Sequence, residues 1–337
     1  MDGLLIIDKP AGPTSHDVVA RMRRALGERR VGHTGTLDPA ATGVLGLVLG
    51  RATRLAQFLS GSDKAYEAVV RFGFATDTAD AQGRVIGAVS SAPPPSREAI
   101  DAALQEFRGT FLQQPPAFSA KKIDGKRSHK LARARRRDAQ QKTFDGRSDP
   151  PDLPDLRDLP GPPGLPSPVN VTAYRLEIVG VEAGCVTLAV QCSAGFYVRA
   201  LAHDLGGRLG VGGHLVALRR TRAGEFGIED ALALETAEQH PERARAAVVP
   251  LAGMLPRLPA VTLTAEGVRR AVNGCELDQR DVVIGVVIGE VTGQVTGESP
   301  IPKPESLVRL LDRAGDLVAI ARPSRGPGFL HPAVVLR

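Results

Sequence analysis

The chain has 337 residues, 42% of them hydrophobic, and this length predicts two domains with at least one substantial core. Lysine and arginine number 43 against 37 acidic residues, and the resulting net charge of +6 favours a polyanionic partner. The three cysteines form no CxxC pair and have no histidine at ligand spacing, so neither a disulfide framework nor a metal site is indicated. No apolar run approaches 18 residues, and we therefore expect a cytoplasmic protein that does not span a membrane. We also expect a monomer.

The first sixty residues predict a strand, a helix and a second apolar segment. Residues 3–7 have the composition of a short buried strand, and a turn rich in glycine and proline follows. Ser15 is expected to cap the helix after that turn. The apolar stripe of this helix consists of Val18, Val19, Met22 and Leu26. A loop over residues 31–39 leads into the apolar segment 40–59.

Strands and helices then mix without regular alternation. Residues 66–72 alternate between apolar and polar, which predicts a strand with one buried face. A turn over 76–83, a strand over 85–89 and a helix over 97–107 follow, and residues 186–192 alternate again before a helical pattern. Such an order indicates an α+β fold with a mixed, mainly antiparallel sheet.

Two changes of composition mark the organisation of the second half. Eight prolines fall within residues 150–168, and we expect a disordered stretch over about 138–168. Beyond Leu258 the chain is rich in valine and glycine, which predicts a small β-rich domain. The expected domains are therefore 1–256 and 257–337.

Residues 32–45, with the sequence GHTGTLDPAATGVL, carry the densest signal for function. Three glycines and a proline predict a tight turn, and Asp38 followed by Pro39 is typical of a helix N-cap and first helical residue. By themselves these residues favour a capping role for Asp38. A phosphate-binding P-loop is excluded, because no Gly-Lys-Ser/Thr follows the glycines.

The same fourteen residues closely resemble the catalytic motif of the TruB family of pseudouridine synthases. Further segments match that family in the same order along roughly the first 225 residues. They are residues 5–10, 63–66, 76–83, 119–126, 192–199 and 213–220. The resemblance implies a pseudouridine synthase catalytic domain, an RNA-gripping insertion over about 110–168 and a C-terminal domain of PUA type.

The resemblance also implies an activity: isomerisation of the uridine at position 55 in the T loop of tRNA to pseudouridine. This reaction breaks the bond between C1′ and N1, turns the base over and joins C1′ to C5. It exchanges no electrons with another molecule, so we expect no cofactor and no metal. The partner is the T stem-loop of tRNA, whose target base must leave the stack to be reached.

By this resemblance Asp38 is the catalytic carboxylate, acting as a nucleophile or as the anion that stabilises C1′. Arg199 is the cation that keeps it ionised and aimed. Tyr66 stacks on the uracil and is a candidate base for a proton of the sugar. Asp80 is a candidate for a supporting hydrogen-bond network, although an aspartate in such a turn more often bonds its own backbone.

The remaining candidates bind substrate. Tyr197 resembles a second wall of the uracil pocket, Leu218 an apolar contact on the base, and His33 the side chain that fills the space left by the extruded nucleotide. On the residues alone, tyrosine and leucine at these positions are ordinary core side chains. The candidates for phosphate contacts are Lys9, Lys121, Lys122, Arg219 and Arg220, for which solvated surface charge is the alternative.

Two other classes of function stay open at this point. One is an RNA-binding module or RNA chaperone with an inactive site, which intact Asp38, Tyr66 and Arg199 disfavour. The other is a glycosidase that uses Asp38 as a nucleophile, for which Asp80 or Glu67 would have to serve as the second carboxylate.

Overall fold

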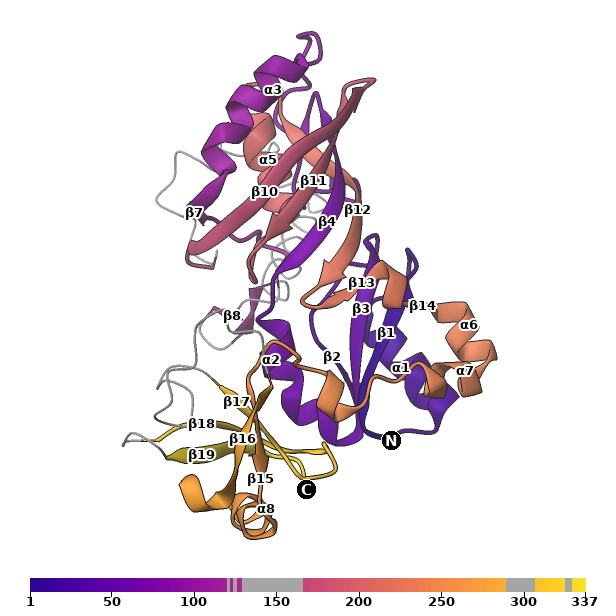
Figure 1. The fold of residues 1–337 in the computed structure, drawn as a ribbon. Helices are drawn as coiled ribbons and strands as arrows, with labels where there is room; N and C mark the ends of the chain where they lie inside the picture. Colours follow the sequence, from indigo (N-terminus) through magenta and orange to yellow (C-terminus); the bar gives the residue numbers. More distant parts are fainter. Residues whose placement is uncertain (120–121, 124–125, 129–165, 289–306, 325–328) are drawn as a thin grey trace. The chain divides into compact units, whose positions relative to one another are not determined.

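The computed structural model describes residues 1–119, 122–123, 126–128, 166–288, 307–324 and 329–337 (Figure 1). The chain divides into two compact units, one formed by Met1–Ser60 with Ala223–Arg337 and the other by Gly61–Arg222. This division differs from the expected boundary at residue 256, which stays a prediction. Most of the expected disordered stretch and most of the expected insertion lie outside the described residues.

The first unit begins with a sheet whose two longest strands, β1 and β3, are almost entirely buried. β1 and β3 pair in antiparallel register from Gly3 opposite Leu49 to Lys9 opposite Gly43. β2 pairs antiparallel with β3, and β14 lies parallel to β1. The elements are β1 (Gly3–Lys9), β2 (Val31–His33), β3 (Thr42–Leu49) and β14 (Leu232–Ala233). The predicted apolar segment 40–59 thus forms β3 and then two short helical turns, η1 (Gly50–Leu55) and α2 (Ala56–Ser60).

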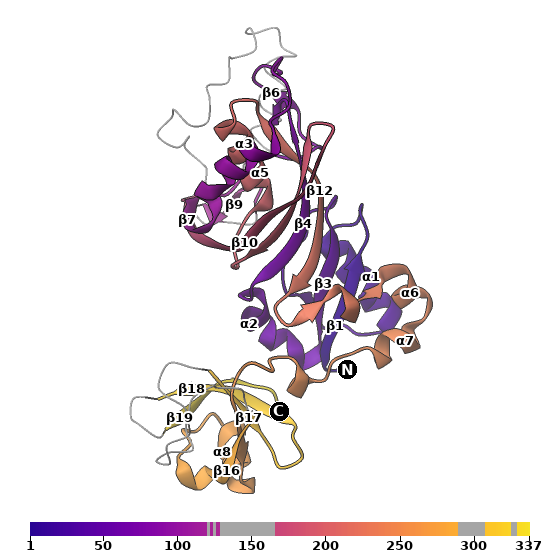
Figure 2. The ribbon, with the colours of Figure 1, turned by 45° about the horizontal axis from the view of Figure 1, so that its top comes forward.

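Three helices gather on one side of β1 in this unit (Figure 2). They are α1 (Ser15–Leu26), α6 (Leu234–Gln239) and α7 (Pro241–Ala246). The apolar stripe predicted for α1 is confirmed, because Val18, Val19, Met22 and Leu26 are all buried. Burial of this stripe is what stabilises a helix of only three turns.

The N-terminus of α1 differs from the prediction. Thr14, and not Ser15, is the N-cap: its hydroxyl accepts a hydrogen bond from Asp17 N at 3.1 Å, and Asp17 Oδ2 accepts one from Thr14 N at 2.8 Å. These two bonds form a capping box, which satisfies two backbone donors of the first turn. The expected capping role of Ser15 is therefore wrong, and its hydroxyl is available for another contact.

A five-stranded sheet with the order β16-β15-β17-β18-β19 confirms the predicted β-rich C-terminal module. β15 and β17 are parallel, and the other neighbours are antiparallel. The strands are β15 (Ala260–Leu263), β16 (Val282–Ile288), β17 (Val308–Leu311), β18 (Leu317–Pro323) and β19 (Leu330–Val335). The buried guanidinium of Arg309 donates to the carbonyls of Ala252, Pro256 and Leu258, which fixes the segment that leads into this sheet.

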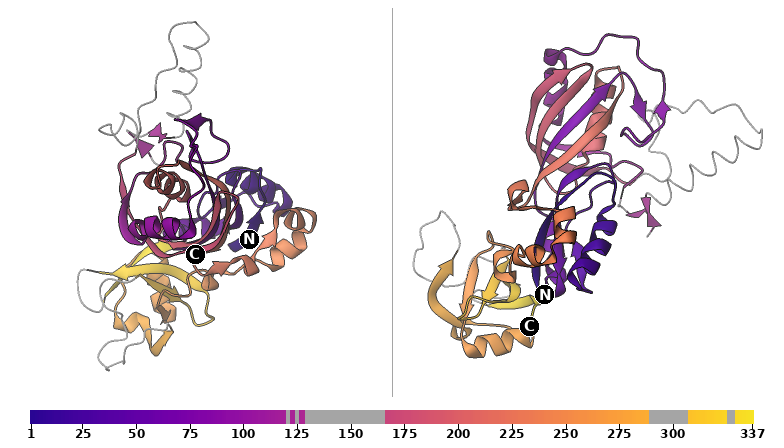
Figure 3. Two further views of the ribbon diagram at one scale, coloured as in Figure 1. Left: turned by 90° about the horizontal axis from the view of Figure 1, so that it is seen from above. Right: turned by 90° about the vertical axis from the view of Figure 1, so that its right-hand side faces the viewer.

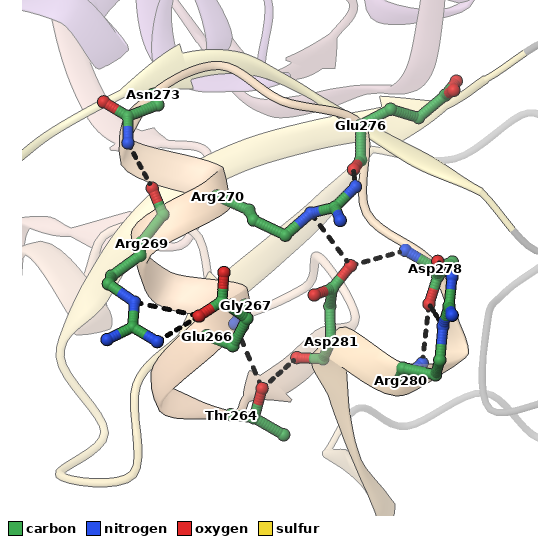
Figure 4. Close-up of polar contacts among 10 residues, drawn as sticks. All are labelled: Thr264, Glu266, Gly267, Arg269, Arg270, Asn273, Glu276, Asp278, Arg280 and Asp281. Atoms are coloured by element: carbon green, nitrogen blue, oxygen red, sulfur yellow. Dashed lines mark hydrogen bonds and ion pairs between the residues drawn. The ribbon is translucent and has the colours of Figure 1, made fainter.

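One helix, α8 (Ala265–Val272), packs against this sheet and is tied to it by polar contacts (Figure 4). Thr264 caps the helix, because its hydroxyl accepts from Gly267 N at 3.0 Å. The carboxylate of Asp281 is buried, lies 3.5 Å from Nε of Arg270 and accepts from Asp278 N at 2.9 Å. A buried carboxylate needs such partners, so these contacts are structural.

The second unit is built on a curved sheet with the strand order β12-β4-β11-β10-β7. The strands are β4 (Lys64–Phe72), β7 (Gly109–Gln113), β10 (Val169–Glu182), β11 (Cys185–Cys192) and β12 (Gly213–Ala223). The helices α3 (Arg97–Leu104) and α5 (Val198–Arg208) cover one face, around which the sheet curves (Figure 3). The pairs β4–β11, β10–β11 and β7–β10 are antiparallel, so the predicted α+β class is confirmed.

The predicted alternation in β4 is also confirmed. Ala68, Val70 and Phe72 are buried in the core of this unit, whereas Glu67 and Arg71 are exposed. No helix among the described residues is both long and apolar enough to cross a bilayer. Within the same residues, no group of three or more histidine, cysteine or acidic side chains could hold a metal ion.

Candidate active site

Asp38 lies in the first unit, in the loop between β2 and β3. Its side chain is half-buried, and its carbonyl accepts a hydrogen bond from Ala41 N at 3.1 Å, which closes a turn. The chain then enters β3 without forming a helix. The capping interpretation of Asp38 is therefore wrong, because no helix begins there and its carboxylate is not needed as a cap.

The backbone on both sides of Asp38 is anchored to the segment that connects β1 with α1. Before it, the Ser15 hydroxyl donates to Leu37 O at 3.1 Å and accepts from Leu37 N at 2.9 Å. After it, the Pro39 carbonyl accepts from Lys9 Nζ at 3.0 Å and from Gly12 N at 2.8 Å. These four hydrogen bonds fix the position of the backbone at Asp38.

Lys9 has a different role from the one predicted. Its side chain is fully buried, and its ammonium also donates to Pro10 O at 2.8 Å. A buried ammonium held by two carbonyls cannot reach an RNA phosphate, so the predicted phosphate contact of Lys9 is corrected to support of the Asp38 loop. Such a charge is costly to bury and needs these acceptors.

His33 ends β2 and is half-buried. The ring of His16, from the first turn of α1, packs edge-on against it with the ring centroids 5.1 Å apart and an interplanar angle of 81°. This T-shaped contact restricts the orientation of the His33 ring. A fixed ring orientation agrees with the role predicted for His33, which is to fill the space left by the extruded nucleotide.

Arg199 lies in the second unit, in the first turn of α5, and only 6% of it is exposed. Its guanidinium donates to Thr78 O at 3.1 Å and to Phe118 O at 2.8 Å, and it lies 3.9 Å from Oδ2 of Asp80. Two carbonyls and a carboxylate thus determine the direction of this planar cation.

The turn over residues 76–83 carries two of these three partners. Asp80 Oδ1 accepts from Thr78 Oγ1 at 2.6 Å and from Gln82 N at 3.0 Å, so Asp80 both closes its own turn and faces Arg199. Ala79 has a φ of 59°, which is unfavourable for a residue with a side chain. Its carbonyl accepts from Leu215 N at 3.0 Å, and this bond to β12 holds the strained turn in place.

The three predicted contacts to the base also belong to the second unit. Tyr66 on β4 and Leu218 on β12 are partly buried and pack against the core of that unit. Tyr197 precedes α5, and its backbone is held by the buried side chain of Gln113, whose Oε1 accepts from Tyr197 N at 2.8 Å and whose Nε2 donates to Tyr197 O at 3.1 Å. Sequence reasoning missed Gln113, because no motif includes it.

The other four residues predicted to contact phosphate differ in burial and in how far the structure describes them. Arg219 is half-buried, whereas Arg220 is only 3% exposed, and such burial corrects the expectation that Arg220 is a surface contact for phosphate. Lys121 lies outside the described residues. For Lys122 the structure gives the backbone, in β8 (Lys122–Ile123), which pairs with β9 (Lys126–Arg127).

Lys64, at the start of β4, is an unexpected buried cation. Only 8% of it is exposed, and its ammonium donates to Ser62 O. Burial, and secondarily the positive charge of Arg220, lowers the pKa of Lys64 to about 8. Cys192 lies opposite Lys64 on the neighbouring strand β11, and burial raises the pKa of its thiol to about 12. The thiol is therefore neutral at pH 7 and supplies no negative charge to compensate Lys64.

We expect the buried Lys64 to make stability rise with pH in the alkaline range. Between pH 8 and its ordinary pKa of 10.5 the unfolded chain binds the Lys64 proton and the folded chain does not. The free energy of unfolding therefore increases over this interval, by up to about 3 kcal/mol. Chemical denaturation of the wild type and of Lys64→Met from pH 7 to 10.5 checks this. The free energy of unfolding of the wild type minus that of Lys64→Met should increase with pH. A value of this difference that stays constant with pH would contradict the assignment.

Each unit thus brings together one part of the candidate site. The first holds Asp38 on a loop supported by Lys9 and Ser15, with His33 nearby in sequence. The second brings Arg199 and Asp80 together and places Tyr197 two residues before Arg199. The predicted pairing of Asp38 with Arg199 joins residues of different units and stays a prediction.

Comparison with known proteins adds independent information. Residues 23–143 match the model of the N-terminal domain of the TruB family of pseudouridylate synthases, and residues 199–255 match that of the tRNA pseudouridylate synthase B C-terminal domain. The tRNA pseudouridine synthase B of Solibacter usitatus is 39% identical over the full length of both chains. That of Cupriavidus metallidurans is 36% identical over 96% of this chain and 91% of its own. A chain of a solved Cbf5–Nop10–Gar1 complex has the same fold, with a TM-score of 0.67, 25% identity and coverage of 99% of this chain and 85% of its own.

Proposed function

The chain belongs to the TruB family of pseudouridylate synthases, and we propose that it isomerises the uridine at position 55 in the T loop of tRNA to pseudouridine. The observation that carries the proposal is the anchored loop of Asp38. A carboxylate on a backbone that is fixed by buried contacts on both sides is suited to chemistry that requires accurate placement.

The reaction needs only rearrangement within the nucleotide. The bond between C1′ and N1 breaks, the base turns over and C1′ bonds to C5; the proton on C5 leaves, and N1 gains one. Asp38 supplies the negative charge that stabilises electron-poor C1′ or bonds to it covalently while the base is detached. Arg199 pairs with that carboxylate and orients it, and the direction of the guanidinium is set by the carbonyls of Thr78 and Phe118.

The target nucleotide must leave the stack of the T loop before this chemistry. Tyr66 stacks on the extruded uracil, with Tyr197 and Leu218 as the other apolar contacts. His33, oriented by His16, occupies the space that the base leaves in the RNA. Arg219, Lys121 and Lys122 contact phosphates and offset part of the few kcal/mol that unstacking costs.

The test is to incubate an unmodified tRNA transcript with the purified full chain and to map pseudouridine at nucleotide resolution. Pseudouridine should form at position 55, and a transcript with cytidine at that position should stay unmodified. Binding without any conversion would instead indicate an RNA-binding module, and release of free uracil would indicate a glycosidase. Either result, or modification at a different position only, would overturn the proposal.

A further inference from the structure

Ser15 has a hydroxyl that its own helix does not use. Thr14 and Asp17 complete the capping box of α1, yet Ser15 is only 1% exposed and its hydroxyl bonds both backbone groups of Leu37, 22 residues away. A buried hydroxyl that accepts from the N–H and donates to the C=O of the same residue satisfies both of its backbone groups, as a neighbouring strand would do in a sheet. It determines both the position and the tilt of its peptide units.

Leu37 needs this contact because no strand ladder provides one. β2 ends at His33 and β3 begins at Thr42, so the backbone between them depends on other partners. The Leu37 side chain is buried, which leaves its peptide groups little access to water. Asp38 follows directly, and the Pro39 carbonyl beyond it is held by Lys9 and Gly12.

From this geometry we infer that Ser15 is a positioning residue for the reaction, acting through Leu37 on the carboxylate of Asp38. The inference rests on the proposed role of Asp38. With Leu37 and Pro39 both fixed, the backbone of Asp38 between them is fixed as well, so the anchored loop sets where its side chain starts. Without the Ser15 hydroxyl, Leu37 loses both hydrogen bonds that hold it, and the loop can move on the N-terminal side of Asp38. The distance between the Asp38 carboxylate and C1′ of the substrate is then no longer fixed.

The expected effect of Ser15→Ala is on the chemical step. A displacement of about 1 Å at a reacting group can cost about 100-fold in rate. We therefore expect the single-turnover rate of pseudouridine formation to fall about 10- to 100-fold at saturating enzyme, with the Kd for tRNA unchanged within about twofold. Ser15→Cys preserves the size of the buried side chain but bonds weakly, and it should show a loss in the same direction.

Thr14→Ala is the matched control. It removes the cap of the same helix and should lower the Tm by a similar amount to Ser15→Ala, but it leaves both bonds to Leu37 intact. Its single-turnover rate should stay within about twofold of the wild type. The inference is overturned if Ser15→Ala and Ser15→Cys keep the wild-type rate, or if Thr14→Ala loses as much rate at an equal loss of Tm.

Asp38→Asn, measured in parallel, separates this inference from the proposed function. Turnover by Asp38→Asn would overturn the role of Asp38 and with it the premise of positioning. An inactive Asp38→Asn beside fully active Ser15 variants would overturn the positioning role alone.

Discussion

Replacing Asp38 by asparagine is expected to lower the single-turnover rate of pseudouridine formation by about 1000-fold or more. Asparagine has nearly the same size and can keep the loop closed through its backbone, but it carries no negative charge for C1′ and is a poor nucleophile. The Kd for tRNA should change little, because the backbone bonds of the loop do not involve this side chain. The measurement is a single-turnover assay on an unmodified transcript with enzyme in excess.

Asp101→Asn is a suitable control for this experiment. Asp101 is a half-exposed carboxylate on α3 whose ion pair with Arg108 is structural, and its replacement should leave the rate within about twofold. Turnover by Asp38→Asn at the level of this control would refute the catalytic role. A matched loss in both variants would point to a general effect of charge on the assay.

The second large effect is expected for Arg199→Lys, with a rate reduced by about 100-fold or more. Lysine keeps the charge, but a single ammonium cannot reproduce a planar guanidinium that donates to both Thr78 and Phe118 while facing Asp80. The charge would therefore take a different position and no longer orient the carboxylate. The measurement is the single-turnover rate together with the Kd, because a change confined to the rate identifies an effect on chemistry.

Arg208→Lys provides the comparison within the same helix. Arg208 pairs with Glu106 at the surface, where a lysine serves nearly as well, so its replacement should alter neither the rate nor the Kd beyond about twofold. Equal losses in Arg199→Lys and Arg208→Lys would show that the first effect comes from α5 as a whole. An active Arg199→Lys would show that charge alone suffices at this position.

The periodicity of apolar residues correctly predicted those helices and strands that bury one face. The alternation in β4 and the apolar stripe of α1 each reflect one buried face, and both are confirmed. The resemblance to the TruB family likewise predicted the family that the relatives show. The domain boundary at residue 256 and the pairing of Asp38 with Arg199 stay predictions.

The errors concern residues whose local role competes with a distant partner. Thr14 and Ser15 are both good caps, and the choice between them depends on Leu37, which draws the Ser15 hydroxyl into the interior. Asp38 and Pro39 fit a helix start, yet the residues after them pair with β1 and become a strand. Tertiary pairing overrides local preference in such cases.

Burial of charge was also beyond the reach of sequence patterns. Lys9 and Arg220 were predicted to contact phosphate, with solvated surface charge as the alternative, but the fold buries both. One carbonyl that holds Lys9 and both that hold Arg199 come from residues 30 to 121 positions away, and any residue type can supply a backbone carbonyl, so residue identity does not reveal it. Gln113, which holds Tyr197 from 84 positions away, was missed for the same reason.

The most direct test of the account is a crystal structure of Asp38→Asn bound to an unmodified T stem-loop. We expect the uridine to be turned out of the loop and stacked on Tyr66, with the side chain of residue 38 within roughly 4 Å of its C1′ and Arg199 beside that side chain. A uridine still stacked within the RNA, or one turned out into a pocket that residues 38, 66 and 199 do not line, would contradict it.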